Sequence, residues 1–142
     1  MFIDLSDKNI VVAGGGNIAT RRVKTLLKFT RNITVVATKV TQELMDLGKA
    51  GTVTLYIRPV KRSDFANAYM VIAATNVPNV NHRVFILGEQ HNLLVNSVDD
   101  IPHCRFMMPA IIDRSPLVVS VASNGASPVL SRQLRTQIEA LL

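Results

Sequence analysis

Apolar residues in the first hundred positions come in short runs, separated by glycines and polar segments. The run NIVVA at 9–13 is rich in β-branched residues, and glycines follow it directly. A short continuous run of this kind is typical of a buried strand in a parallel sheet. Four further runs have the same character, at 32–38, 53–57, 69–75 and 93–98. The pattern therefore predicts five strands.

Between these runs the apolar positions recur at helical spacing. From 17 to 29, the side chains of Ile18, Val23, Leu26 and Leu27 fall on one predicted helix face, and basic residues fall mostly opposite. Further helices are predicted from Thr41 to Gly51 and over 78–90, with a helical turn at 62–68. Strands that alternate with helices predict an α/β fold, a Rossmann-like parallel sheet wound by right-handed crossovers.

The pattern changes after position 98. Residues 99–110 contain two prolines and are expected to be irregular, 115–123 are predicted to form a strand, and 127–142 a helix capped by Ser127. We therefore expect a Rossmann-like domain over 1–113 and a strand-helix segment over 114–142. One strand and one helix cannot bury their own apolar faces, so the segment must pack on the domain or on a second subunit. We favour a homodimer.

Composition indicates in which cellular compartment the protein acts and which class of ligand it binds. No apolar run is long enough to span a bilayer, and the amino terminus lacks the features of a secretory signal. Cys104 is the only cysteine, which favours a reducing compartment and hence the cytoplasm. The net charge is +6, but the basic residues are dispersed and aromatic clusters are lacking, which disfavours nucleic acid. Residues 8–31 contain six Lys or Arg and no acid, so an anionic small ligand is favoured.

The segment GGGNIA at 14–19 fits the pattern G-x-G-x-x-G/A between a predicted strand and a predicted helix. In dinucleotide-binding folds the first glycine permits a tight turn and the second lets a diphosphate approach the backbone at the helix start. Gly14 and Gly16 occupy these positions, and a dinucleotide is the expected ligand. The alternative is a tight turn without a ligand.

Further cofactor contacts are expected where the second and fourth strands end. The second strand ends without the carboxylate that usually binds the adenosine ribose, and Thr38 and Lys39 stand there instead. Thr38 could bond the ribose and Lys39 could tolerate a 2′-phosphate, so these residues alone do not decide between NAD and NADP. Thr75 and Asn76 follow the fourth strand at the same predicted sheet edge.

The segments GGGNIATRR, IAATN, VNSVDD, MPAIIDRSPL and NGASPVLSRQLR occur in this order along the chain. In order and spacing they resemble the precorrin-2 dehydrogenase part of siroheme synthases, from about Leu5 to Leu142. The resemblance implies an NAD-dependent oxidation of precorrin-2 to sirohydrochlorin on a Rossmann domain followed by a dimerisation segment. It also implies cofactor contacts at Asn17, Ile18, Thr38 and Lys39, a catalytic role for Asp99, and a substrate-facing Ser123.

Asp99 follows the fifth predicted strand, at the edge where open α/β sheets bind ligands. A carboxylate there could accept the proton that leaves the macrocycle during oxidation. The alternative is that Asp99, like Asp100, caps a loop. The tetrapyrrole substrate carries many carboxylates, for which arginine is well suited. Candidate substrate contacts are Arg105, Arg114, Arg132 and Arg135, of which the first three are preferred with Ser123.

The sequence departs from the family pattern in two places. Asn124 replaces the first glycine of the usual S-G-G-x-S-P loop, and the chain stops at Leu142, where many members continue into a helical domain. The second departure weakens the alternative activity, a metal chelatase. His103 and Cys104 lack the spacing of a zinc site, so no resident metal is expected. The less favoured alternative is that Asp99 or His103 binds a metal ion transiently during its transfer. A non-catalytic NAD-sensing module is the remaining alternative.

Overall fold

The structure is a computed structural model that describes residues 1–142, and it divides into two compact units, 1–105 and 106–142. The division lies earlier than the expected boundary between 113 and 114. Residues 110–114 form a strand that pairs with a second strand at 117–121, so a boundary at 113 would cut through a hairpin. Each unit is described separately below.

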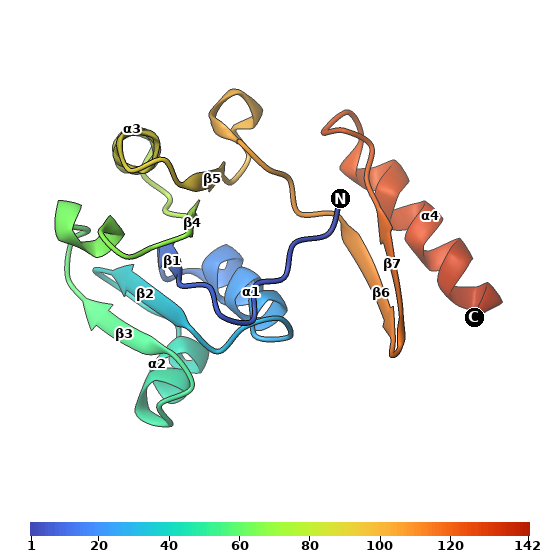
Figure 1. The fold of residues 1–142 in the computed structure, drawn as a ribbon, viewed down its shortest axis with the longest axis horizontal. Coiled ribbons are helices and arrows are strands. Elements are labelled where there is room, and N and C mark those ends of the chain that lie inside the picture. The colour runs from blue at the N-terminus through green and yellow to red at the C-terminus, as the bar shows by residue number, and fades with distance from the viewer. The chain divides into compact units, whose positions relative to one another are not determined.

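The first unit is built on one parallel sheet of five strands in the order β3-β2-β1-β4-β5 (Figure 1). Its strands are β1 (Ile10–Ala13), β2 (Ile33–Ala37), β3 (Thr54–Ile57), β4 (Met70–Ala73) and β5 (Leu94–Ser97). Every neighbouring pair is parallel, so all five carboxyl ends lie at the same edge. The predicted α/β Rossmann-like fold is confirmed, and its strand order reverses beside β1, where such folds bind ligands.

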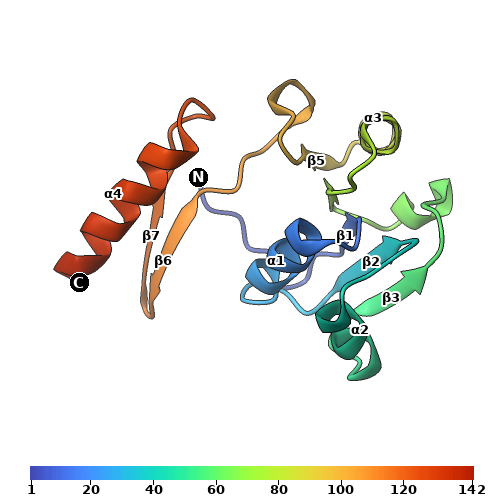
Figure 2. The ribbon, with the colours of Figure 1, turned by 180° about the vertical axis from the view of Figure 1, so that it is seen from behind.

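Helices cover both faces of this sheet. The helices α1 (Asn17–Leu26) and α2 (Gln42–Lys49) lie on one face, and α3 (Pro78–Gln90) lies on the other with the 3-10 turn η1 (Arg62–Phe65) (Figures 1 and 2). The predicted start of α2 is confirmed, because the Thr41 hydroxyl accepts a hydrogen bond from the Leu44 amide. Gly51 follows α2 with φ +73°, the left-handed conformation that favours glycine after a helix.

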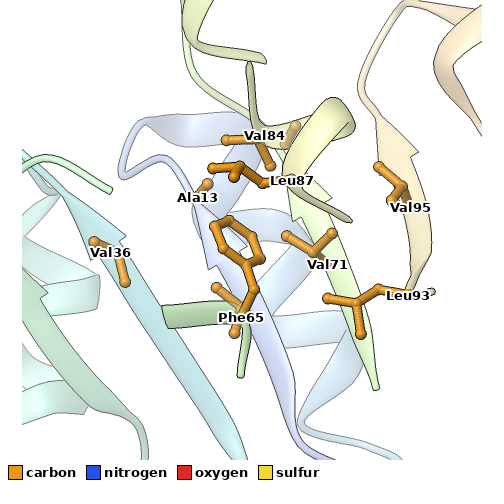
Figure 3. Close-up of a cluster of buried hydrophobic side chains, with 10 residues drawn as sticks. Ala13, Val36, Phe65, Val71, Val84, Leu87, Leu93 and Val95 are labelled. Carbon is orange, nitrogen blue, oxygen red and sulfur yellow. The ribbon is translucent and has the colours of Figure 1, made fainter. Parts of the chain in front are cut away.

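The core on the α3 face combines alternate strand residues with one side of the helix. Figure 3 shows Val84 and Leu87 of α3, together with Phe65 of η1, directed toward the strand residues. The strand contribution comes from every second position of β1, β4 and β5 and from Val36 of β2, namely Val11, Ala13, Val36, Val71, Ala73 and Val95. Burying each of the larger side chains contributes about 1.5–3 kcal/mol. This core fixes α3 against the strand ends that carry the site.

Ile18 does not share the helix face that was predicted for it with Val23 and Leu26. Helix α1 buries Ala19, Thr20, Val23 and Leu26, whereas Ile18 remains 38% exposed. Ile18 precedes Val23 by five residues, which places the two side chains well apart around a helix of 3.6 residues per turn. Ile18 is therefore directed away from the sheet.

The second unit contains a hairpin and one helix. Strands β6 (Ala110–Arg114) and β7 (Leu117–Val121) pair antiparallel, and α4 (Pro128–Leu141) packs on both. The sequence predicted β7 and α4 but missed β6, which is short and ends in the charged pair Asp113 and Arg114. The predicted cap is confirmed, since the Ser127 hydroxyl accepts from the Leu130 amide at 3.2 Å. None of the helices in the chain combines the length and the apolarity needed to cross a bilayer.

Apolar side chains of the second unit are exposed on α4. Val129, Leu130 and Leu134 are 55%, 48% and 39% exposed, and Ile112 is the only residue of the hairpin that is fully buried. An apolar stripe is thus present on this helix, and much of it is exposed to solvent in the single chain.

Candidate cofactor-binding site

The three successive glycines after β1 meet different surroundings. Gly14 has φ +132°, and a Cβ atom there would clash with the carbonyl of Ala74, at the end of the neighbouring strand β4. A Cβ atom at Gly15 would clash with the carbonyl of Lys39. At Gly16 a Cβ atom would meet nothing within 4 Å. The protein's own packing therefore requires the first two glycines, and only at the third would an added Cβ atom lie in open space.

That open space lies at the amino end of α1. Gly16 is the N-cap in extended conformation (φ −81°, ψ −165°), and no side chain caps the helix. The first N–H groups of a helix have no partner within it, and the helix dipole adds positive potential at this end. The first turn also contains no acidic residue. The exposed backbone, the free N–H groups and the positive potential together form a potential binding site for a diphosphate.

A cavity of about 750 Å³ opens at this point of the sheet edge. It is formed by the glycine turn, by the segments that follow β2, β3 and β4, and by one side of α3. The structure brings every residue expected to contact the cofactor into its wall: Gly14, Gly16, Asn17, Ile18, Thr38, Lys39, Thr75 and Asn76. Its apolar wall includes Val60, Val80, Val84 and Leu87. These residues fit a dinucleotide, with polar groups for the phosphates and an apolar slot for a flat base.

The segment after β4 is held in place by Asn81, a residue to which the sequence analysis gave no role. Its side-chain oxygen accepts from the Thr75 amide at 3.0 Å and lies 2.7 Å from the Thr75 hydroxyl. Its amide nitrogen donates to the Thr75 carbonyl at 3.0 Å. Asn81 therefore clamps both ends of one residue in the cavity wall. The available signal was an asparagine in the first turn of a helix, directly after a strand end.

Two threonines connect the glycine turn to α2. The Thr20 hydroxyl donates to the Gly16 carbonyl at 2.8 Å and lies 2.7 Å from the Thr41 hydroxyl. The Thr41 amide also donates to the Gly15 carbonyl at 2.9 Å. Thr20 of α1 and Thr41 at the start of α2 therefore hold the turn in place through hydrogen bonds. Neither threonine fills the open space beside Gly16.

The charges that line the cavity are all positive. Lys39, Arg58 and Arg83 contribute to its wall, and no carboxylate does. Arg58 is already paired, because its guanidinium donates to both carboxylate oxygens of Asp64, at 2.9 and 2.7 Å. This hydrogen bonding lowers the pKa of Asp64 and raises the pKa of Arg58. Lys39 and Arg83 have no ion pair.

Asp99 lies at the same sheet edge, beyond the end of β5, and does not line this cavity. It is exposed and has φ +59°, a left-handed conformation that aspartate adopts more readily than most residues. Arg22 of α1 lies within electrostatic range of it. The pKa of Arg22 is lowered mainly by burial and then by Arg21, while Asp99 and Cys104 act in the opposite direction. A basic side chain therefore accompanies the candidate catalytic carboxylate.

The neighbours of Asp99 form a compact polar cluster. Asp100 accepts from Nδ1 of His103 at 2.6 Å, and the His103 ring contacts those of His82 and Phe85 edge-on. The Cys104 thiol donates to the Ser97 and Asp100 carbonyls, and burial raises its pKa. No three His, Cys, Asp or Glu side chains come together in a group that could hold a metal ion.

The candidate substrate residues are engaged in local contacts. Arg105, in the first unit, binds Glu89 through two hydrogen bonds at 3.1 and 2.8 Å. In the second unit, Arg114 and Arg135 both bind Glu139, whereas Arg132 is exposed and forms no ion pair. Arg105 and Arg114 would have to exchange these glutamates for a substrate carboxylate.

Ser123 shapes the loop before α4. Its hydroxyl accepts from the Ser127 amide at 2.8 Å. Asn124 and Gly125 have φ values of 54° and 80°, in the left-handed region. Asparagine tolerates that region better than most residues, which is consistent with Asn124 at a position where the family pattern has glycine.

Comparison with known proteins agrees with a nucleotide-binding site at the glycine turn. Residues 1–110 match the family of putative NAD(P)-binding proteins. The siroheme synthase of Acinetobacter baylyi is 52% identical over 141 residues, which cover 99% of this chain and 31% of that protein. The siroheme synthase of Pseudoalteromonas translucida is 42% identical over 142 residues, covering 100% and 30%. The chain thus spans about a third of the length of these relatives.

The solved structure of SirC, a precorrin-2 dehydrogenase, is similar to this chain with a TM-score of 0.83. The two are 30% identical, and the match covers 100% of this chain and 69% of SirC. The two relatives compared by sequence are both siroheme synthases, and the similar solved structure is a precorrin-2 dehydrogenase. The chain belongs to this NAD(P)-binding family and groups with SirC, of which it covers more than two thirds.

Proposed function

We propose that this chain catalyses the NAD-dependent oxidation of precorrin-2 to sirohydrochlorin. The observation that carries the proposal is the open backbone at Gly16, set in a cavity whose wall contains every expected cofactor residue. The similarity to SirC extends over the whole chain and supports the choice of substrate.

The residues of the cavity have distinct parts in holding the cofactor. The free N–H groups at the start of α1 bind the diphosphate beside Gly16, Thr38 bonds the adenosine ribose, and Thr75 and Asn76 border the cofactor along the end of β4. When bound, NAD supplies the hydride acceptor. The chain's own task is to orient the macrocycle against it and to take up the proton that is released.

Asp99 is the group proposed to accept that proton. It stands at the carboxyl edge of the sheet, one strand beyond β4, and its side chain is accessible to a large substrate. The neighbouring carboxylate Asp100 is held by His103, so it is less suited to the role. General-base catalysis of this kind contributes about 10²–10⁴ to a rate.

The test is an anaerobic absorbance assay with precorrin-2 and NAD. We expect Asp99→Asn to lower kcat by about 100-fold or more while NAD binding is retained, because Asp99 does not line the cofactor cavity. Asp100→Asn is the matched control and is expected to stay within about threefold of the wild type.

Two results would contradict this assignment. Normal turnover in Asp99→Asn would remove the residue from the mechanism. A wild-type chain that binds NAD but leaves the spectrum of precorrin-2 unchanged would instead fit the NAD-sensing alternative.

The proposal extends to assembly and location. The exposed apolar side chains of α4, among them Val129, Leu130 and Leu134, support a homodimer in which a second copy covers them. The single, unpaired Cys104 supports the cytoplasm as the place of action.

A further inference from the structure

We propose that Asn81 is a positioning residue for the nicotinamide half of the cofactor. It acts through Thr75, because its hydrogen bonds fix the segment after β4 in the conformation that borders this half. The inference rests on the proposed cofactor site, but it does not depend on the identity of the substrate. Three observations carry it: the strand order, the hydrogen bonds of Thr75 and the free side chain of Asn76.

The strand order sets the direction in which a dinucleotide lies along the sheet edge. Strand β1 lies between β2 and β4, and the diphosphate site is the glycine turn that follows β1 (Figure 1). In Rossmann folds the adenosine ribose is bound at the end of the second strand, which here means at Thr38. The other half of the cofactor then extends from the diphosphate toward the end of β4. The cavity continues in this direction, since Thr75, Asn76 and Val77 line its wall.

Asn81 binds both backbone groups of Thr75. Strand β4 ends at Ala73, and its hydrogen bonding to β1 continues only as far as the Ala74 amide, which donates to the Ala13 carbonyl at 2.8 Å. Beyond that point the Thr75 amide donates to Oδ1 of Asn81, and the Thr75 carbonyl accepts from Nδ2, both at 3.0 Å. One side chain of α3 therefore takes the place of the missing sheet partner.

The Thr75 hydroxyl is engaged in the same way. It donates to Oδ1 of Asn81 at 2.7 Å and accepts from the Val77 amide at 3.2 Å. Thr75 thus binds the protein with its side chain, while its neighbour Asn76 is exposed in the cavity wall and forms no hydrogen bond. An asparagine amide both donates and accepts, which suits the ribose hydroxyls and the carboxamide of the nicotinamide half.

A wall that is ordered before the ligand arrives lowers the entropic cost of binding. Without Asn81, the amide and carbonyl of Thr75 lose their partners, and the segment has to be ordered when the cofactor binds. The glycine turn keeps its own hydrogen bonds to Thr20 and Thr41. The loss is therefore expected to fall on the nicotinamide half and to spare the adenosine and the diphosphate.

The experiment compares the binding of NAD and adenosine 5′-diphosphate by calorimetric titration. Both ligands contain the adenosine and the diphosphate, and only NAD contains the nicotinamide half. We expect Asn81→Leu, which keeps the size of the side chain but none of its hydrogen bonds, to raise the Kd of NAD at least about tenfold and that of adenosine 5′-diphosphate less than about threefold. Asn81→Ala removes the same bonds without a branched side chain and is expected to show the same selective effect.

Two further variants refine the comparison. Asn79→Leu is the matched control, because it makes the same change at an exposed residue in the first turn of the same helix, outside the cavity wall. It should leave both Kd values unchanged. Thr75→Val removes only the hydroxyl bond and should raise the Kd of NAD by less than Asn81→Leu does. Thermal unfolding of each variant verifies that the fold is intact.

The outcomes separate this inference from the proposed function. If Asn81→Leu and Asn81→Ala bind NAD as the wild type does, Asn81 has no positioning role. If they weaken both ligands equally, Asn81 supports the domain as a whole, and the assignment to the nicotinamide half is overturned. A wild-type chain that binds neither ligand contradicts the proposed cofactor site itself, and the inference fails with it.

Discussion

Gly15 and Gly16 are adjacent in the chain, but their missing side chains serve different purposes. At Gly15 the space is filled by the protein itself, through the carbonyl of Lys39 and the side chains of Val40 and Ala37. At Gly16 the space is open and borders the cavity. Stability and cofactor binding therefore depend on different members of the same turn.

This difference can be measured with two matched substitutions. Gly15→Ala is expected to lower the free energy of unfolding by about 1–3 kcal/mol, because the added methyl group overpacks a tight contact. Gly16→Ala is expected to change it by less than about 1 kcal/mol and to weaken NAD binding roughly tenfold or more, since the methyl group occupies the space that the diphosphate needs.

Chemical denaturation and calorimetric titration of both variants provide the two measurements. If Gly16→Ala binds NAD as the wild type does, the diphosphate lies elsewhere. If Gly15→Ala keeps full stability, the backbone contact with Lys39 can relax.

Single residues also mark the limit of what could be predicted. The glycine pattern, Thr38 and Lys39 were identifiable because their positions follow from the period of strand and helix. The role of Asn81 was not, because an asparagine in the first turn of a helix does not by itself show which backbone groups its side chain will bind. The pairing of Arg105 with Glu89 was equally inaccessible, since it joins residues sixteen positions apart.

At the scale of elements, the link between β3 and η1 depends on one buried carboxylate. Asp64 accepts from both terminal nitrogens of Arg58 and from the Lys61 amide, and its side chain is only 6% exposed. The hydrogen bonds from Arg58 lower its pKa from the usual 3.8. A group whose pKa is lower in the folded state stabilises the fold above its unfolded pKa, and this stabilisation is lost as the pH falls through the folded value.

We therefore expect Asp64→Asn to be less stable than the wild type at pH 7, and the difference to shrink as the pH is lowered below about 4. Urea denaturation between pH 2.5 and 7 measures both curves. Ser63→Ala, a change at the neighbouring residue that removes no charge, should run parallel to the wild type. A difference that is independent of pH would show that the carboxylate charge does not contribute.

Elements with a clear period were predicted well, and the exceptions have physical causes. The strands β1, β2, β4 and β5 are largely apolar runs because both faces of the sheet are covered there, whereas the edge strand β3 is mostly exposed. Strand β6 was missed because it is covered on one side only, with Ile112 buried and Asp113 and Arg114 exposed. Its pairing with β7 also explains why the division between the two units falls before residue 110.

At the scale of the whole molecule, the exposed apolar stripe of α4 is the feature that supports the proposed homodimer. Leu134 lies near the middle of the helix and is 39% exposed. Leu134→Glu would place an unpaired charge in the proposed dimer interface, and we expect the dimer dissociation constant to rise roughly 100-fold. Gln133→Glu adds the same charge at an exposed polar position of the same helix and should leave it unchanged.

Sedimentation equilibrium over a range of concentrations makes this comparison directly. A wild-type chain that stays monomeric at high micromolar concentration would contradict the dimer. A dimer that Leu134→Glu leaves intact would place the contact on another surface.

The way in which Lys39 is built into the fold has a consequence for protein engineering. Its carbonyl packs against Gly15 in the glycine turn, whereas its side chain is exposed and forms no ion pair. The side chain at this position can therefore be exchanged while the backbone contact that supports the turn is kept. A small library of acidic, neutral and basic replacements at position 39 would vary the charge of the cavity wall on an unchanged fold.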